Sequence, residues 1–550
     1  MKLPLIHALA LIFAALLAGL PLPAFAQATK DTPGTPNVPE ASGTYATMLG
    51  AQPFGTESYR IIAGPGGTRR SEAEAVLAGS KVRATTAVGA DGLPASFTME
   101  LNGAPFVRHE YTAGGVRVEA GAQPLKPLPA RPDVLLENGL WHHFHFLLAR
   151  YDAARGGAQQ FTALLPSQAV AFKVTLERVG SPAFDVKGRQ TRVAHYRAAT
   201  DLGLSFEVWA DEAGVPLVVS VPAQSLRAVR GGSEDLAAAV FPPKPGPSDS
   251  DPYTSEEVTF TNGEQKLVGT LTVPKSGAGP HPAAVLISGS GAQDRDGTGV
   301  ADIYLRIAET LSAAGMIVLR VDDRGAGKST GPLRQPSYRD LVADSRAAFE
   351  YVLARREVDK SRVALVGHSE GAETALIIAA EDPRVAAVAL LAGPSRPVDK
   401  VVVEQTLYQA ALARPVAPSD RAQLSAIGRQ FIEFFERAAA EPRPPAGAED
   451  KLAWFREHAE HDPSATARKV RVPALVLIGD RDMLVLPYHA LALAQAMTEA
   501  GNRRVTLRVL PGLTHLFTPA DPSQGGGAGA VSAEFLKTLR EWAAAALPAK

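Results

Sequence analysis

The stretch RVALVGHSEGAETALIIAA, residues 362–380, joins an apolar run, a short polar turn and a helix-forming run. The Val- and Leu-rich run predicts a buried strand, and the Ala- and Leu-rich run predicts a helix. Gly367 and Gly371 stand two positions either side of Ser369. A strand-to-helix turn this tight strains its central residue and leaves no room for side chains two positions away. The pattern therefore predicts that the Ser369 hydroxyl projects from the edge of a sheet.

Apolar strands of the same kind recur on both sides of this stretch and alternate with segments of helical period. The strand runs are PAAVLISG at 282–289, MIVLRVDD at 316–323, VAAVALLAG at 385–393, PALVLIGD at 473–480 and RVTLRVLPG at 504–512. Such runs predict an α/β fold, a mostly parallel sheet with helices on both faces. A helix-rich insertion at about 395–467 interrupts the alternation, and we interpret it as a helical lid.

The first part of the chain has a different pattern. Between residues 45 and 230, short strands rich in β-branched and aromatic residues are separated by Gly, Asp-Gly and Pro turns, which predicts a β-rich accessory domain. One segment at 137–157 has the spacing of a helix. Residues 27–44 are interpreted as a flexible lead-in and 231–255 as a linker, because both are rich in Pro with Gly, Ser or Thr. Residues 256–548 form the predicted α/β domain.

The composition excludes several classes of function. With 56 basic and 57 acidic residues among 550, the chain has a net charge of −1, so no nucleic acid is expected as a partner. The absence of cysteine excludes disulfides, thiolate metal sites and a cysteine nucleophile. We expect neither a metal nor a cofactor.

Residues 1–26 have the features of a signal peptide. Lys2 is followed by a long apolar run, and Ala24 and Ala26 form a small-residue cleavage pattern. The alternative is a membrane anchor, but the run is short for a stable span and is followed by prolines. The sequence therefore predicts a periplasmic or secreted protein without a stable membrane span after cleavage.

Ser369 can act as a nucleophile only with a base and with an acid that orients the base. In sheets of this topology the acid and then a histidine follow the serine along the chain. The strand run at 473–480 is followed by Asp482, and the next strand run is followed by His515. Asp480 directly follows a glycine and is expected to turn the loop, so Asp482 is the favoured acid and His515 the base.

Such chemistry also needs two N–H groups that stabilise negative charge on the substrate oxygen. The loop at 289–291, after the first parallel strand, is Gly-Ser-Gly, and its small residues allow close approach to a carbonyl group. We expect the N–H groups of Ser290 and Glu370 to fill this role. The Glu370 side chain either biases the charge of the substrate or faces solvent.

Five stretches occur in the order GSGAQDRDG, VDDRGAGKSTG, GHSEG, GDRD and GLTH. Together they resemble the α/β-hydrolase superfamily, closest to its exported bacterial esterase and peptidase-like members, which are related to dienelactone hydrolases and prolyl oligopeptidase-type enzymes. The resemblance covers about residues 256–548 and implies Ser369 as nucleophile, Asp482 as acid and His515 as base. Ser288 stands at a loop position where many members have histidine, so the oxyanion loop is expected to be arranged differently.

Two further patterns have both functional and structural interpretations. DDRGAGKST at 322–330 lacks the spacing of a phosphate-binding loop, and Asp323 and Arg324 are expected to form a buried pair there. WHHFHF at 141–146 could supply zinc ligands, but on a helix its histidines point in different directions. We interpret these histidines as packing residues.

The sequence thus predicts an exported serine hydrolase that cleaves carboxylic esters through an acyl-enzyme. A serine peptidase or aminopeptidase acting on short peptides is the alternative, although the sequence identifies no charged group that would hold a peptide terminus. A catalytically inert lipid- or glycan-binding protein is the alternative of another class, and the intact order of serine, aspartate and histidine argues against it. The expected partner is a small-molecule ester or a short peptide.

Overall fold

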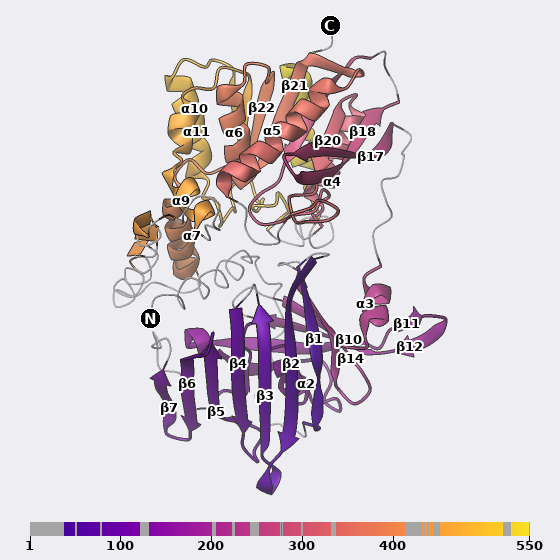
Figure 1. Cartoon of the computed structure of the whole chain (residues 1–550), viewed down its shortest axis with the longest axis vertical. Coiled ribbons are helices and arrows are strands. Elements are labelled where there is room, and N and C mark those ends of the chain that lie inside the picture. The colour runs from indigo at the N-terminus through magenta and orange to yellow at the C-terminus, as the bar shows by residue number, and fades with distance from the viewer. Residues whose placement is uncertain are drawn as a thin grey trace. The chain divides into compact units, whose positions relative to one another are not determined.

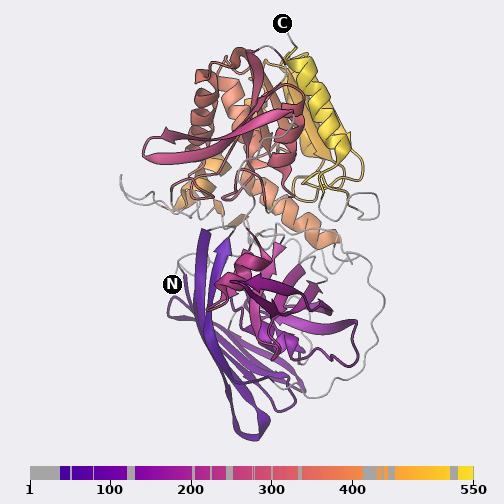
Figure 2. The same cartoon turned by 90° about the vertical axis from the view of Figure 1, so that its right-hand side faces the viewer.

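The computed structural model describes residues 38–548 except 50–51, 78–79, 121–130, 201–204, 223–225, 243–251, 276, 278, 299–300, 332–336, most of 413–451 and 521–529. The predicted signal peptide, most of the predicted lead-in and the middle of the predicted lid lie outside the described residues. The chain divides into two compact units, Met1–Lys244 and Pro245–Lys550, and each has its own large sheet (Figure 1; Figure 2).

The N-terminal unit is built on one sheet. In the described part of the chain its fourteen strands lie in the order β7-β6-β5-β4-β3-β2-β1-β16-β15-β14-β13-β10-β9-β8, and only β8 pairs in parallel with its neighbour. A separate hairpin holds β11 (Ala183–Val186) and β12 (Arg189–Arg192). The strands of the large sheet are β1 (Ala41–Leu49), β2 (Gln52–Ala63), β3 (Arg69–Leu77), β4 (Ser80–Val88), β5 (Pro94–Leu101), β6 (Ala104–Thr112), β7 (Gly115–Ala120), β8 (Val134–Leu135), β9 (Ala158–Leu165), β10 (Val170–Gly180), β13 (Ala194–Thr200), β14 (Ser205–Ala210), β15 (Pro216–Val221) and β16 (Leu226–Arg230).

Alternating side chains give this sheet a buried face, as in β4, where Val82 and Ala84 are buried and Lys81 and Arg83 are exposed. Helix α2 (His143–Leu148) packs against that core with all its residues buried. The helix predicted at 137–157 is therefore too long, because glycines with positive φ lie on either side of α2.

Two elements fall in segments that the sequence assigned otherwise. Helix α3 (Glu234–Val240) lies inside the stretch interpreted as a linker. Strand β1 begins inside the predicted lead-in, where Ala41 and the residues after it pair with β2.

The C-terminal unit is built on a second sheet. Its eight strands, in the described residues, lie in the order β17-β18-β20-β19-β21-β22-β23-β24. Strand β18 is antiparallel to both of its neighbours, and the strands from β20 to β24 are parallel. The bounds are β17 (Tyr253–Asn262), β18 (Gln265–Pro274), β19 (His281–Ile287), β20 (Ile317–Val321), β21 (Val358–His368), β22 (Ala387–Leu391), β23 (Ala474–Gly479) and β24 (Val505–Leu510).

The strand order creates a crevice at one end of this sheet. From β19 the chain crosses through α4 (Ile303–Ala313) to β20, and then through α5 (Tyr338–Ala354) back past β19 to β21. Because such crossovers are right-handed, α4 and α5 cover opposite faces of the sheet. The carboxyl ends of β19 and β21 meet where the order reverses, with Ile287 paired to Gly367. Open α/β sheets bind ligands at such a point.

The remaining helices are α6 (Glu370–Glu381), α7 (Val398–Leu412), α9 (Ala453–Glu460), α10 (Pro463–Ala467), α11 (Tyr488–Glu499) and α12 (Ala533–Ala546). Three of them, α7, α9 and α10, belong to the insertion (Figure 1). Helix α9 contacts α5, and α10 contacts α6 and α11, so this part of the insertion packs against the core. Within the described residues, no helix combines the length and apolar character needed to cross a membrane.

Candidate active site

Ser369 occupies the tight turn between β21 and α6. Its backbone has φ 55° and ψ −121°, a conformation that residues with a side chain rarely adopt, as the turn pattern predicts. A Cβ on Gly367 would lie 2.0 Å from the carbonyl oxygen of Gly371, and a Cβ on Gly371 would lie 2.3 Å from that of Ile287. No residue with a side chain fits at either position without a shift of the backbone. Ser369 itself is half-buried and stands at the N-terminus of α6, where backbone N–H groups point outward.

His515 and Asp482 form a hydrogen-bonded pair in the loops after β24 and β23. Nδ1 of His515 donates to Oδ2 of Asp482 at 2.8 Å, and the Asp482 side chain is fully buried. The other oxygen of Asp482 accepts two backbone N–H groups of its own loop, each at 2.9 Å. Asp480 instead accepts the N–H of Gly512 at 2.7 Å. The structure therefore brings Asp482 to His515 and uses Asp480 to hold the loop.

His368, the residue before Ser369, also contacts His515 and was not singled out from the sequence. Its Nε2 lies 3.0 Å from the carbonyl oxygen of His515, so this nitrogen carries the proton and donates it. Burial lowers the pKa of His368 to about 3, which keeps the imidazole neutral. The side chain thus ties the backbone of His515 to the turn that carries Ser369.

The loop after β19 lies directly against the Ser369 turn. A Cβ on Gly289 would lie 3.1 Å from Cβ of Ser369. The N–H of Gly289 donates to the hydroxyl of Tyr304 at 2.9 Å and is therefore engaged. Within the described part of the chain, the N–H groups of Ser290 and Glu370 donate to no protein acceptor. These two groups, which the sequence analysis selected, are free to meet a substrate.

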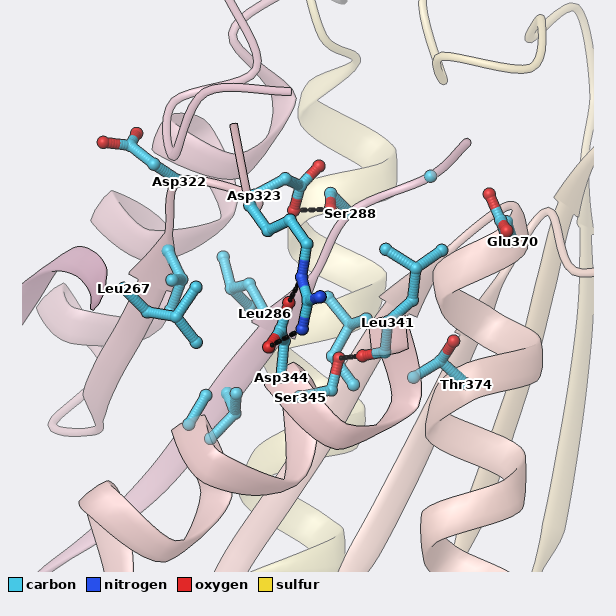
Figure 3. A pocket seen from close by; sticks show the side chains of 16 residues that line it. Leu267, Leu286, Ser288, Asp322, Asp323, Leu341, Asp344, Ser345, Glu370 and Thr374 are labelled. Carbon is cyan, nitrogen blue, oxygen red and sulfur yellow. Dashed lines mark hydrogen bonds and ion pairs between the residues drawn. The ribbon is translucent and has the colours of Figure 1, made fainter. Parts of the chain in front are cut away.

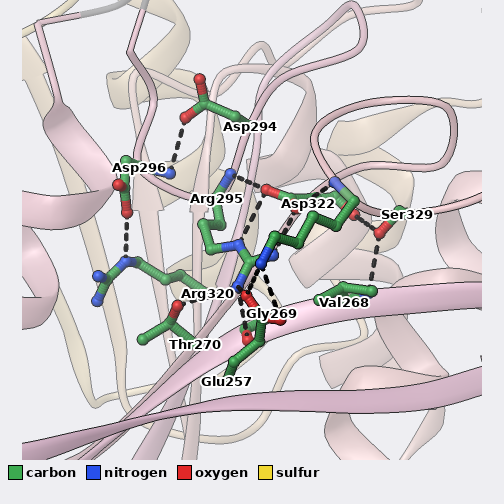
Figure 4. A network of polar contacts seen from close by, with 11 residues as sticks. Glu257, Val268, Gly269, Thr270, Asp294, Arg295, Asp296, Arg320, Asp322 and Ser329 are labelled. Atoms are coloured by element: carbon green, nitrogen blue, oxygen red, sulfur yellow. Dashed lines mark hydrogen bonds and ion pairs between the residues drawn. The ribbon is translucent and has the colours of Figure 1, made fainter. Parts of the chain in front are cut away.

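Two adjacent carboxylates hold this loop. Asp323 accepts the hydroxyl of Ser288 at 2.5 Å (Figure 3). It also accepts the N–H of Gln293 at 2.9 Å. Asp322 accepts hydrogen bonds from the backbone and the guanidinium of Arg295 (Figure 4). Burial raises the pKa of Asp323 to about 8, although its hydrogen bonds act in the opposite direction. Ser288, which stands where the family resemblance led us to expect a differently arranged loop, therefore anchors the loop through Asp323.

Arg324 does not pair with Asp323, so that expectation was wrong. Its guanidinium extends to α5 and binds Asp344 at 2.8 Å, whereas Asp323 points toward Ser288 (Figure 3). Asp323 and Arg324 begin a turn in which the N–H of Ala326 donates to the carbonyl oxygen of Asp323 at 2.8 Å, and the two side chains leave this turn toward different partners. A cavity of about 50 Å³ lies in this region and is too small for an acyl chain.

The Glu370 side chain is buried, with 5% of its surface exposed, so the interpretation that it faces solvent was wrong. Oε1 accepts the indole N–H of Trp454, on α9, at 2.7 Å. Burial raises the pKa of Glu370, although the nearby His458 and the Trp454 hydrogen bond act in the opposite direction. The residue after Ser369 therefore contacts the insertion.

Sequence comparisons relate this part of the chain to known proteins. Residues 297–522 match the family model described as serine aminopeptidase, S33. Esterase EstD of Thermotoga maritima is 32% identical over 273 residues, which are 48% of this chain and 61% of EstD. The C-terminal unit has an α/β-hydrolase fold and is similar in sequence to serine hydrolases of that superfamily.

The C-terminal unit has further relatives. An uncharacterised protein of Mycobacterium tuberculosis is 34% identical over 146 residues, which are 26% of this chain and 48% of that protein. The chain thus spans 61% and 48% of the length of these two curated relatives. Among solved structures, Est1E from Butyrivibrio proteoclasticus aligns with a TM-score of 0.37 and 16% identity, over 53% of this chain and 99% of that chain.

The histidines of WHHFHF lie in the N-terminal unit, and each has a different partner. His142 binds Glu57 through Nδ1 at 2.5 Å and Ser71 through Nε2 at 3.0 Å. His143 binds a threonine hydroxyl, and His145 binds the hydroxyl of Tyr59. No group of three or more His, Asp or Glu suited to a metal ion occurs among the residues that the structure describes. Burial lowers the pKa of His142 and of His145 to about 3, so both are neutral.

Proposed function

We propose that the α/β hydrolase unit cleaves carboxylic esters through an acyl-enzyme, with Ser369 as nucleophile, His515 as base and Asp482 as acid. The observation that carries the proposal is the 2.8 Å hydrogen bond from His515 to Asp482, on a histidine whose backbone is tied to the strained Ser369 turn. The name of the relative EstD supports the ester class.

In the proposed reaction the Ser369 hydroxyl attacks the ester carbonyl carbon while Nε2 of His515 takes the hydroxyl proton. Asp482 holds the imidazole through Nδ1 and balances the charge of the imidazolium. The N–H groups of Ser290 and Glu370 stabilise the oxyanion of the tetrahedral intermediate. Collapse of that intermediate expels the alcohol, which takes the proton from His515. A water molecule then gives a proton to His515 and attacks the acyl-serine, which forms a second tetrahedral intermediate. Collapse of this intermediate releases the acid, and the Ser369 oxygen takes the proton back from His515.

A serine aminopeptidase is the second candidate, and the description of the matching family model favours it. Such an enzyme needs a carboxylate near Ser369 that is free to bind the ammonium group of the substrate. Glu370 is the acid next to Ser369 in the sequence, but its side chain is buried and its Oε1 accepts the Trp454 hydrogen bond. The burial of this carboxylate beneath the insertion favours the ester as substrate.

Two measurements test the proposal. Wild-type protein and Ser369→Ala are treated with a fluorophosphonate probe, and only the wild type should become labelled, at Ser369. Activity is then compared on p-nitrophenyl esters of graded chain length and on aminoacyl and dipeptidyl anilides. Faster turnover of the esters supports the proposal, whereas faster turnover of the anilides identifies a peptidase. Absence of both labelling and turnover in a folded protein would indicate an inert lipid- or glycan-binding protein.

The pattern of residues 1–26 supports the further proposal that the protein is exported to the periplasm or secreted. Its substrate would then be a small ester reached outside the cytoplasm. Fractionation of cells that express the full chain tests this, with N-terminal sequencing of the exported form. An uncleaved protein in the cytoplasmic fraction contradicts it.

A further inference from the structure

The insertion reaches the nucleophile turn through a buried polar cluster that has no part in the proposed triad. The cluster is formed by Glu370 and Glu373 of α6, Trp454 and His458 of α9, and Tyr338 of α5. Each of these side chains is at most 5% exposed. The two glutamates lie one helical turn apart and therefore share one face of α6.

Both glutamates find their partners on α9. Trp454 donates to Oε1 of Glu370 at 2.7 Å, and Nε2 of His458 donates to Oε1 of Glu373 at 3.0 Å. Nδ1 of His458 lies 3.6 Å from Oε1 of Glu370, so the imidazole faces both carboxylates. The other oxygen of each glutamate has no hydrogen-bond partner among the described residues. The hydrogen bonds from Trp454 and His458 are therefore the contacts that offset the cost of burying these two carboxyl groups.

The rings around His458 fix its orientation. Tyr338 stacks on the imidazole, with centroids 4.3 Å apart and planes at 7°. Trp454 meets the imidazole edge-on, with centroids 4.8 Å apart. Burial opposes a charged imidazolium, but Glu373 and Glu370 outweigh burial and raise the pKa of His458. The imidazole is thus held between the two glutamates at the start of α6.

The first turn of α6 also carries the groups that react in the proposed function. Ser369 precedes the helix with a strained backbone, and the N–H of Glu370 is one of the two proposed oxyanion donors. A strained turn keeps its geometry only when the surrounding structure over-determines it. Glu370 contributes both the side-chain oxygen that Trp454 binds and the N–H that would bind the oxyanion. A shift of its side chain is therefore expected to move its N–H.

We propose that Trp454 and His458 are positioning residues for hydrolysis, which hold the first turn of α6 in its reactive geometry through Glu370 and Glu373. This inference rests on the proposed function, because it assigns the Glu370 N–H to the oxyanion. Neither residue touches the reacting atoms. Their effect falls on the transition state, where the oxyanion forms, more than on substrate binding.

The test uses the full chain and four variants, with a p-nitrophenyl ester as substrate. Trp454→Phe removes the indole N–H and keeps an aromatic ring against His458. His458→Gln removes the imidazole and keeps a donor for Glu373. His461→Gln is the matched control, since His461 ends the same helix and forms no hydrogen bond with α6. The double variant His458→Gln/Glu373→Gln tests whether His458 acts through Glu373.

We expect kcat to fall by about 10- to 100-fold in Trp454→Phe and in His458→Gln, because small displacements of catalytic groups have effects of this size. KM should stay within about threefold of the wild type, since ground-state binding is not involved. Affinity for a trifluoromethyl ketone, whose adduct with Ser369 carries an oxyanion, should fall in step with kcat/KM. His461→Gln should behave as the wild type, and the double variant should lose no more than His458→Gln.

Wild-type kcat in both single variants overturns the inference, and so does a rise in KM at unchanged kcat, which would place these residues in substrate binding. Circular dichroism and fluorophosphonate labelling identify any variant that fails to fold. If His458→Gln does not fold, the milder Trp454→Phe decides. Failure of the wild type to label at Ser369 would instead refute the proposed function, so the two failures are distinguishable.

Discussion

Nδ1 of His515 lies 2.8 Å from Oδ2 of Asp482, whereas Asp480, two residues earlier, binds the N–H of Gly512. Asp482→Asn should therefore lower kcat by about 10³-fold or more, because the imidazolium loses its counter-charge and the imidazole its correct tautomer. Asp480→Asn should change kcat by less than about tenfold, since the asparagine oxygen can still accept the Gly512 N–H. Steady-state kinetics on one ester checks both. If the two variants exchange their behaviour, the acid has been assigned to the wrong residue.

Gly289 touches the nucleophile turn, and its substitution should impair catalysis more than folding. A Cβ there would lie 3.1 Å from Cβ of Ser369 and 3.3 Å from the carbonyl oxygen of His368. Gly289→Ala should push the oxyanion loop away from Ser369 and lower kcat by about 10²-fold, a loss typical of one missing oxyanion donor. Kinetics and thermal unfolding of the variant measure the two effects.

Gly291 of the same loop provides the control. It has φ +86°, but a Cβ there would meet nothing within 4 Å. Gly291→Ala should cost about 1 kcal/mol of stability through backbone strain and leave kcat within a few-fold of the wild type. Equal losses of kcat in the two variants would mean that the loop does not hold an oxyanion donor against Ser369.

Glu137, in the N-terminal unit, should make stability depend on pH. Burial raises its pKa from 4.5 to about 7, although the hydrogen bonds from Ser167 and Asn138 act in the opposite direction. A raised carboxyl pKa means that the folded state favours the proton. The contribution of Glu137 to the free energy of unfolding is therefore fully present below pH 4.5, where the carboxyl group is protonated in both states. This contribution is lost as the pH rises through about 7.

Glu137→Gln cannot ionise and should lack this loss. Between pH 5 and 8 the unfolding free energy of the wild type should fall by up to about 3 kcal/mol more than that of the variant. Urea unfolding of the full chain at several pH values, followed by tryptophan fluorescence, measures the difference. Glu110→Gln, at a half-exposed position, should follow the wild type. Parallel curves for the wild type and Glu137→Gln would contradict the prediction.

The parallel sheet could be predicted because its strands are buried on both faces and read as continuous apolar runs, as in Ala474–Gly479. Strand β3 (Arg69–Leu77) has a much weaker sequence pattern, for the converse reason. Its inward positions hold mainly small residues, among them Ser71, Ala73 and Ala75, and its outward positions hold Glu and Arg. Alternation is present there, but the residue types have low strand propensity.

The parts of the candidate site that depend on local sequence pattern and on chain order could be predicted. The turn at Ser369, the two aspartates and His515 each follow a strand, and the topology brings strand ends together. The contacts of His458 with Glu373, 85 positions away, leave no local pattern in the sequence. The same holds for the hydrogen bond from His368 to the backbone of His515. Such contacts depend on packing between helices and loops, which a single sequence does not specify.

The packing of backbone against backbone around Gly367, Gly371 and Gly479 limits how this protein can diverge. A Cβ at any of the three would meet a carbonyl oxygen at 2.0 to 2.3 Å. Substitutions of these glycines are therefore expected to disrupt the fold, so descendants of this sequence should retain them. Heritable changes in substrate preference must instead accumulate in side chains that surround the turn, so the reaction and the choice of substrate can evolve at separate rates.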